Sequence, residues 1–164
     1  MKLNATTVKL IAGALLCVAS QLAAADWNPY EAPAYGISML VPSGMKMQEQ
    51  MLDGGWSRVY GSLGGLKLYG LAKPGEKETD AAIEKFASQV IGIPSSDWKM
   101  IDKGKGRGFE HYRTFQAGRA NKLWFGGYGV SAKGNYLLYI ETTVDDYESH
   151  KADYRKWYES IHVE

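Results

Sequence analysis

Between residues 35 and 144 the chain consists mainly of short β-prone segments separated by turns that contain glycine. Apolar and small or polar side chains alternate in most of these segments, as they do in strands with one buried face. The predicted strands are residues 35–41, 45–51, 56–63, 66–72, 98–102, 109–115, 122–130 and 136–144. Gly64-Gly65 favours a tight hairpin, so sequential strands are expected to pair antiparallel. The turns therefore limit the chain to a mainly antiparallel sheet.

The hydrophobic period changes from two to about 3.6 in two places. A helix is predicted from Glu78 or Thr79 to about Ile91, with Gly92 and Pro94 as stop signals. A second helix is predicted from Asp145 or Asp146, with one apolar and aromatic stripe: Tyr147, His150, Tyr154, Trp157 and Ile161. The predicted order is ββββαββββα, an α+β fold in which two amphipathic helices cover a mainly antiparallel sheet.

Residues 1–25 are predicted to be a cleaved signal peptide. Lys2 and Lys9 precede and flank an apolar run of ten residues, and Ala23-Ala24-Ala25 supplies small side chains before Asp26. Ten residues are too few to span a bilayer as a helix. Leu16 stands where a lipobox has a small residue, so Cys17 is not expected to be lipidated. The expected location is the periplasm or the exterior of a bacterium, by a Sec-type route.

Residues 26–164 are expected to form a single globular domain. They hold no cysteine, so disulfides, thiol catalysis and zinc–cysteine sites are excluded from this part of the chain. The whole chain has 19 basic and 18 acidic residues, a formal charge of +1, which argues against nucleic acid as a partner. No second apolar stretch is long enough for a membrane span, and the sequence leaves the oligomeric state open.

The segment Tyr35-Gly36-Ile37-Ser38-Met39-Leu40-Val41-Pro42-Ser43-Gly44 resembles the opening of Mog1/PsbP-like domains, an aromatic residue and an apolar strand followed by Pro-x-Gly. The helix before Gly92 and the terminal segment 154–161 resemble later landmarks of that family, which includes bacterial periplasmic members of the DcrB type. The resemblance implies an α/β/α sandwich with binding or accessory roles. It brings no catalytic motif to this chain.

Four methionines lie within thirteen residues: Met39, Met45, Met47 and Met51. Thioethers suit Cu(I), so a periplasmic copper-handling protein is one alternative. No histidine or cysteine accompanies them, which favours methionines that fill the core or a binding surface. No cofactor is predicted.

Enzymatic chemistry has little support in the sequence. His150 and His162 are about 18 Å apart along one predicted helix, so they cannot share a metal ion. Glu110 and His111 would point to opposite faces of a strand. No Gly-x-Ser-x-Gly elbow is present. The protein is expected not to be an enzyme, and a hydrolase with dispersed catalytic residues is the remaining alternative of that class.

Aromatic and basic residues supply the predicted binding surface. Trp124, Tyr128, Tyr136 and Tyr139 place rings on both faces of neighbouring strands, where they either anchor a partner or shield the second face of the sheet. Lys105 and Arg107 belong to a glycine-rich basic turn, residues 103–108, that is either solvated or touches an anionic partner. The favoured function is a non-enzymatic binding or accessory domain that recognises another envelope or secreted protein, or a ligand. An inhibitor or immunity protein is a specific form of this hypothesis.

Overall fold

The computed structural model describes residues 26–164, and the predicted signal peptide lies outside them. Most of the chain in this range is β-structure. The strands are β1 (Trp27–Ala32), β2 (Ile37–Pro42), β3 (Gln48–Met51), β4 (Ser57–Leu63), β5 (Leu66–Pro74), β6 (Lys99–Gly106), β7 (Phe109–Arg119), β8 (Lys122–Ser131), β9 (Gly134–Thr143) and β10 (His162–Val163). The α-helices are α1 (Asp80–Ile91), α2 (Val144–Ser149) and α3 (Lys151–Ser160), and short 3₁₀ turns lie at Pro33–Tyr35, Asp53–Gly55 and Ser95–Asp97.

Seven strands form one antiparallel sheet in the order β3-β4-β5-β9-β8-β7-β6. Pairing of β5 with β9 joins the strands that precede α1 to those that follow it, with Tyr69 opposite Tyr139. A second antiparallel sheet has the order β1-β2-β10 and brings the two ends of the described chain together. The large sheet therefore has β3 and β6 as its edge strands.

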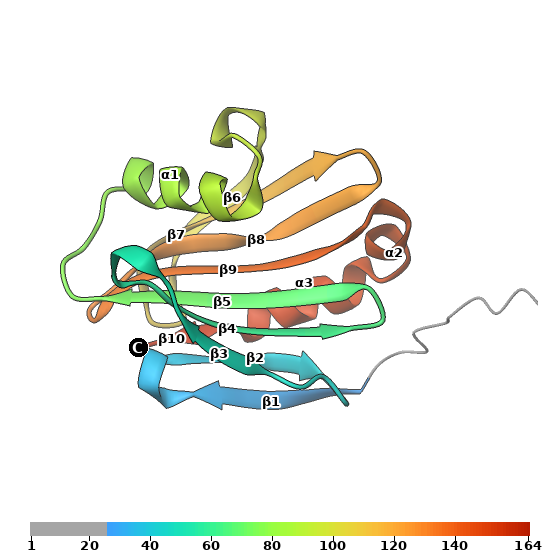
Figure 1. The fold of residues 1–164 in the computed structure, drawn as a ribbon, viewed down its shortest axis with the longest axis horizontal. Coiled ribbons are helices and arrows are strands. Elements are labelled where there is room, and N and C mark those ends of the chain that lie inside the picture. Colours follow the sequence, from blue (N-terminus) through green and yellow to red (C-terminus); the bar gives the residue numbers. More distant parts are fainter. Residues whose placement is uncertain (1–25) are drawn as a thin grey trace, which may run out of the picture.

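Both faces of the large sheet carry covering elements, as Figure 1 shows. On one face lies α1, which buries Ile83, Ala87 and Ile91. On the other face lie α2, α3 and the small sheet, whose core side chains include Trp157 of α3 and Ile37 of β2. The expected α+β class and the helices on an antiparallel sheet are confirmed. No helix in residues 26–164 combines the length and the apolar character needed to cross a membrane.

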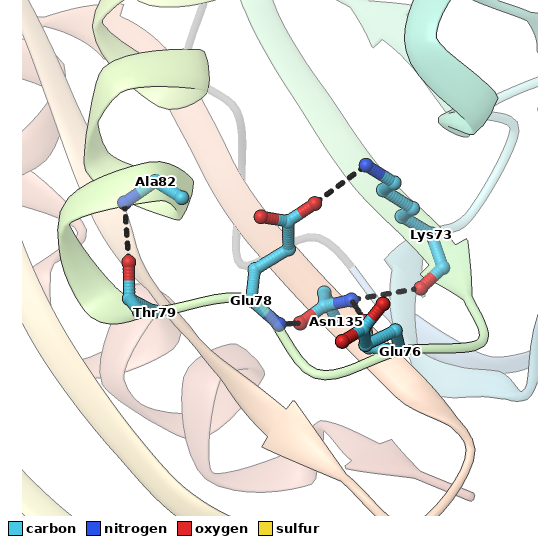
Figure 2. Close-up of polar contacts among 6 residues, drawn as sticks. All are labelled: Lys73, Glu76, Glu78, Thr79, Ala82 and Asn135. Carbon is cyan, nitrogen blue, oxygen red and sulfur yellow. Dashed lines mark hydrogen bonds and ion pairs between the residues drawn. The ribbon is translucent and has the colours of Figure 1, made fainter.

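Local signals explain the position of α1. Thr79 caps its start, with the side-chain oxygen accepting a hydrogen bond from the Ala82 N–H at 3.2 Å. Gly92 ends it at φ +80°, a conformation that glycine adopts without strain. The connection that leads into α1 is held by the side chain of Asn135 on β9, which bonds three main-chain groups (Figure 2). Sequence capping and one buried amide together place the helix.

The predicted element boundaries need correction in several places; β7, for example, runs to Arg119 and not only to Phe115. Pro29 and Pro33 predict an irregular segment over residues 26–34, but residues 27–32 form β1. β1 is an edge strand, so Pro29 lies where no further strand needs its missing N–H. β3 begins at Gln48 rather than at Met45. β6 continues to Gly106, which shortens the predicted turn to Arg107-Gly108. The terminal helix is divided at His150, and β10 follows it.

Candidate functional site

The four predicted aromatic binding residues are buried: the exposed fraction is 7% for Trp124, 0% for Tyr128, and 3% for both Tyr136 and Tyr139. Trp124, Tyr128 and Tyr139 lie in the core under α1, and Tyr136 lies in the core of the opposite face. Of the two alternatives, an exposed binding surface is therefore wrong, and the rings shield the sheet. The physical reason is that β8 and β9 are central strands with both faces covered, so the rings on either face shield the sheet.

The four methionines do not form one site. Met39 and Met45 are core residues, and the sulfurs of Met45 and Met47 meet over Gly61, each within 2.8 Å of the place a Cβ would take there. Met51 is 71% exposed and accepts a hydrogen bond from Ser57 at 3.1 Å. Ser57 lies four residues from Gly61 on β4, roughly 13 Å along a strand. The four thioethers therefore do not meet at one place, and a four-methionine copper site is not formed by these residues.

A hollow of about 600 Å³ lies on the α3 side of the sheet, between β6 and β7 and the helices α2 and α3. We refer to it as the β7–α3 groove. It exists because the large sheet is wider than the layer that covers it: within residues 26–164, no side chain of β6 enters the core beneath α3. Its lining residues are Lys99, Met100, Ile101, Asp102, Arg107, Tyr112, Thr114, Gln116, Phe125, Tyr147, Lys151, Arg155, Tyr158 and Glu159.

Strand alternation selects the floor of the β7–α3 groove. Phe115 and Ala117 of β7 point toward α1 and are buried there, so Tyr112, Thr114 and Gln116 face the other side. β6 is an edge strand with an extra residue at Ile101, because Met100 pairs with Phe115 and Asp102 with Thr114. Met100 and Ile101 are 42% and 47% exposed on this rim, among the few exposed large apolar side chains in the described part of the chain.

Arg107 lies at one end of the groove, in the turn between β6 and β7. Its guanidinium carbon is 4.9 Å from the ring centre of Tyr112 and 4.7 Å from that of Tyr158. The two rings are nearly perpendicular, at 73°, so the guanidinium lies in the corner between them. One Nη donates a hydrogen bond to the main-chain carbonyl of Tyr158. Arg107 is thus a half-buried cation held by two aromatic faces.

The backbone around Arg107 is also held in place. Arg107 has φ +56°, which few residues other than glycine adopt. Its carbonyl accepts a hydrogen bond from the Val163 N–H of β10 at 2.9 Å. Gly108 has φ +86° and lies against β10 so closely that a Cβ would be 1.5 Å from the Val163 carbonyl oxygen. β10 therefore fixes the turn that presents Arg107 to the groove.

Tyr158 links the helix wall to the floor. Its phenol accepts a hydrogen bond from the buried Thr114 hydroxyl at 2.6 Å, and its ring occupies the space left by Gly127. Burial raises the pKa of Tyr158 above its ordinary value, so the phenol stays neutral.

The charge of the groove is uneven. Four basic side chains line it against two acidic ones, Asp102 and Glu159. Among the described residues, Lys99, Arg107 and Arg155 form no ion pair, and Lys151 pairs only with Glu148, at 3.5 Å, where both are more than half exposed. The whole chain carries a formal charge of only +1, so this local excess of positive charge is a property of the groove.

A second hollow, about 540 Å³, lies beside the outer side of α1 over the stacked rings of Trp56 and Phe86. Its charges already compensate one another, as in the ion pair of Lys73 with Glu78 at 2.5 Å. The β7–α3 groove differs because three of its four cations, Lys99, Arg107 and Arg155, have no ion-pair partner among residues 26–164. It is therefore the better candidate for binding a ligand of opposite charge.

A polar cluster at the start of α1 most resembles a catalytic arrangement. Asp80 bonds His111 Nε2 through one carboxylate oxygen and Arg113 Nε through the other, each at 2.9 Å. No hydroxyl group of the described residues bonds to His111, and no three histidine, cysteine or acidic side chains in residues 26–164 are grouped as metal ligands. The cluster ties β7 to the helix N-terminus, where an acidic residue is favoured.

Of the predicted site residues, Arg107 lines the groove, while Lys105 is exposed on β6. Sequence reasoning missed Tyr112, Thr114 and Tyr158. The sequence does hold a signal for Tyr158, which lies four residues after Tyr154 and next to the predicted apolar stripe. A ring in that position is expected at the border of the buried face of the helix. Which strand leaves its face uncovered cannot be read from such a pattern.

The fold matches that of a known structure. The solution structure of cyanobacterial PsbP (CyanoP) from Synechocystis sp. PCC 6803 aligns with a TM-score of 0.53 at 16% sequence identity, over 88% of this chain and 96% of that one. A protein of unknown function from Pseudomonas aeruginosa aligns with a TM-score of 0.32 at 9% identity, over 79% and 91%. No family model and no curated protein matches the sequence. The chain thus has a PsbP-like fold, and this likeness concerns the fold alone.

Proposed function

We propose that this protein is an exported, non-enzymatic accessory domain that binds a segment of another envelope or secreted protein in the β7–α3 groove. The observation that carries the proposal is the groove itself, about 600 Å³ with Arg107 held between Tyr112 and Tyr158 at its end. Its volume falls in the range of ligand sites, and its aromatic and apolar lining with a few placed polar groups is typical of them.

Three further features support recognition of a protein. Arginine and tyrosine are the residue types that most often dominate binding energy at interfaces. Met100 and Ile101 add exposed apolar area on the β6 rim. The PsbP-like fold is compatible with an accessory role. Export rests on the predicted signal peptide and is therefore part of the proposal. An inhibitor or immunity protein is the most specific form of the proposed function.

The proposal is tested by affinity capture from an envelope extract of the source organism. Gln116 is a half-buried residue on the floor of the groove, and Gln116→Trp would fill the space with a residue type that strands favour. Ser62→Trp is the matched control, because Ser62 is an exposed strand residue outside the groove.

We expect quantitative mass spectrometry to find at least one protein that is retained by the wild type and by Ser62→Trp and lost with Gln116→Trp. Retention of the same proteins by Gln116→Trp would refute a groove-based function. Both variants are first compared with the wild type by thermal unfolding, so that loss of capture is assigned to the groove and not to the fold.

A further inference from the structure

We infer that the β7–α3 groove recognises an extended acidic segment of its partner, with Arg107 as the residue that receives a carboxylate. The inference rests on the proposed function and adds the chemistry of the ligand. The juxtaposition that carries it is a positioned guanidinium at one end of a groove whose other cations, Lys99 and Arg155, also lack acidic partners among residues 26–164.

Arg107 is prepared for a planar anion. A guanidinium has five N–H donors in a rigid fork, and Arg107 uses one nitrogen for the Tyr158 carbonyl and also bonds the Tyr158 phenol, which leaves further donors for a ligand. The rings of Tyr112 and Tyr158 fix the plane of the group, and β10 fixes its backbone turn. Because the side chain is already ordered, binding a carboxylate costs little additional rotamer entropy.

The rest of the groove extends the same preference. Lys151 and Arg155 lie along the α3 wall, and Lys99 lies on the β6 rim. Opposite charge favours approach of an acidic segment and disfavours a basic one. The β6 edge also carries Lys103 and Lys105, so two copies of this edge would repel each other and an acidic strand would not.

A peptide fits these features better than a purely anionic polymer does. Met100 and Ile101 are exposed beside the cations, and Phe125 and Tyr147 contribute apolar surface to the floor and the wall. A phosphate polymer, a sulfated glycan or an anionic membrane surface would use the charges and leave this apolar area unused. A segment with acidic and apolar side chains in alternation would use both.

The test uses two synthetic heptapeptides with blocked ends, Gly-Glu-Leu-Glu-Leu-Glu-Gly and its counterpart with glutamine for glutamate. Binding is measured by calorimetry and by amide chemical shifts of the ¹⁵N-labelled protein at about 50 mM salt, where charge contacts are little screened. We expect the acidic peptide to bind at least tenfold more tightly, with shifts confined to the groove. Heparin oligosaccharides and vesicles containing phosphatidylglycerol serve as the competing anions.

Two matched pairs of variants assign the contact. Arg107→Gln is expected to weaken binding of the acidic peptide about tenfold or more, while Arg119→Gln, an exposed arginine at the other end of β7, changes it less than twofold. Arg155→Gln is compared in the same way with Lys156→Gln, its exposed neighbour on α3 that lies outside the groove. Arg155 contributes no core packing, so this pair remains informative if Arg107→Gln unfolds.

Equal binding of the two peptides, or unchanged binding after both Arg107→Gln and Arg155→Gln, would overturn the inference. Tighter binding of heparin or vesicles than of the acidic peptide would overturn it as well. Failure of this inference can be distinguished from failure of the proposed function. If Gln116→Trp abolishes capture of a partner but Arg107→Gln leaves it unchanged, the groove is still the binding site and the carboxylate contact with Arg107 is refuted.

Discussion

The side chain of Asn135 is expected to contribute a large share of the stability of the connection between β5 and α1. Asn135 is fully buried on β9. Its Oδ1 accepts from the Glu78 N–H at 2.7 Å, and its Nδ2 donates to the carbonyls of Lys73 at 3.2 Å and Glu76 at 2.8 Å (Figure 2). Main-chain N–H groups only donate and carbonyls only accept, so these partners fix the orientation of the amide.

Asn135→Ala removes all three hydrogen bonds at once. A hydrogen bond contributes about 1 kcal/mol net, and a buried group left without a partner costs about 1–3 kcal/mol. Glu76 lies in an exposed turn, where water can replace the amide, so its carbonyl is the least costly of the three. We expect a loss of about 2–3 kcal/mol in the free energy of unfolding, which corresponds to roughly 6–12 °C in the melting temperature.

Asn135→Asp is a sharper variant because it keeps the size of the side chain. It still offers an acceptor to the Glu78 N–H, but it turns an oxygen toward the carbonyls of Lys73 and Glu76 and buries a charge. We expect it to be at least as destabilising as Asn135→Ala. Asn28→Ala is the control, since Asn28 is exposed on β1 and its change should stay within about 0.5 kcal/mol of the wild type.

Urea unfolding followed by tryptophan fluorescence measures these differences. If Asn135→Ala unfolds within about 0.5 kcal/mol of the wild type, the amide does not hold the connection and the reasoning is refuted. If Asn135→Asp is more stable than Asn135→Ala at neutral pH, then steric fit, rather than the direction of the hydrogen bonds, is what matters at this position.

Three other predictions concern the leader, the β10 contact and one ion pair. N-terminal sequencing of the exported protein should begin at Asp26, and a mature chain that still begins at Met1 would contradict the predicted cleavage. Gly108→Ala should lower the free energy of unfolding by about 2–4 kcal/mol, because its Cβ would clash with Val163. Gly65 has a similar φ of +89° but lies in open space, so Gly65→Ala should show only the backbone strain of about 1–2 kcal/mol. Equal losses in urea unfolding would argue against the close contact. Burial opposes ionisation of Glu141, but the ammonium groups of Lys122 at 2.9 Å and Lys67 at 3.4 Å outweigh it and lower the pKa of Glu141. A carboxyl group whose pKa is lowered in the folded state stabilises the fold above its unfolded-state pKa of about 4.3, and this stabilisation is lost as the pH falls through the folded-state pKa. The free energy of unfolding of Glu141→Gln should therefore differ from that of the wild type by no more than about 1 kcal/mol at pH 7, and by less at pH 3. An unfolding difference that is the same at both pH values would contradict this reading.

The sequence could predict the elements of the fold because these depend on local patterns. Alternation of side chains marks the strands, Thr79 and Gly92 bound α1, and the Gly64-Gly65 pair marks a hairpin. Local patterns also have a limit, which β1 illustrates. Pro29 within it and Pro33 directly after it indicate an irregular segment, and only its place at the edge of the small sheet makes a strand possible.

The candidate site could not be predicted in the same way. Trp124 and Tyr139 have the residue types of a binding surface, but β8 and β9 lie in the middle of a sheet that is covered on both faces. Arg107 was recognised as a basic residue in a turn, while its partners Tyr112 and Tyr158 come from a strand and a helix that are far apart in the sequence.

By itself the sequence therefore determined most of the secondary structure, the antiparallel pairing of neighbouring strands and the near-neutral charge. Only the tertiary structure decided the order of the strands across the sheet, and with it which rings are buried and that α3 does not reach over β6. The physical reason is the range of the interactions. Periodicity and capping act over a few residues, whereas exposure depends on which distant segment covers a face, and no local pattern records that.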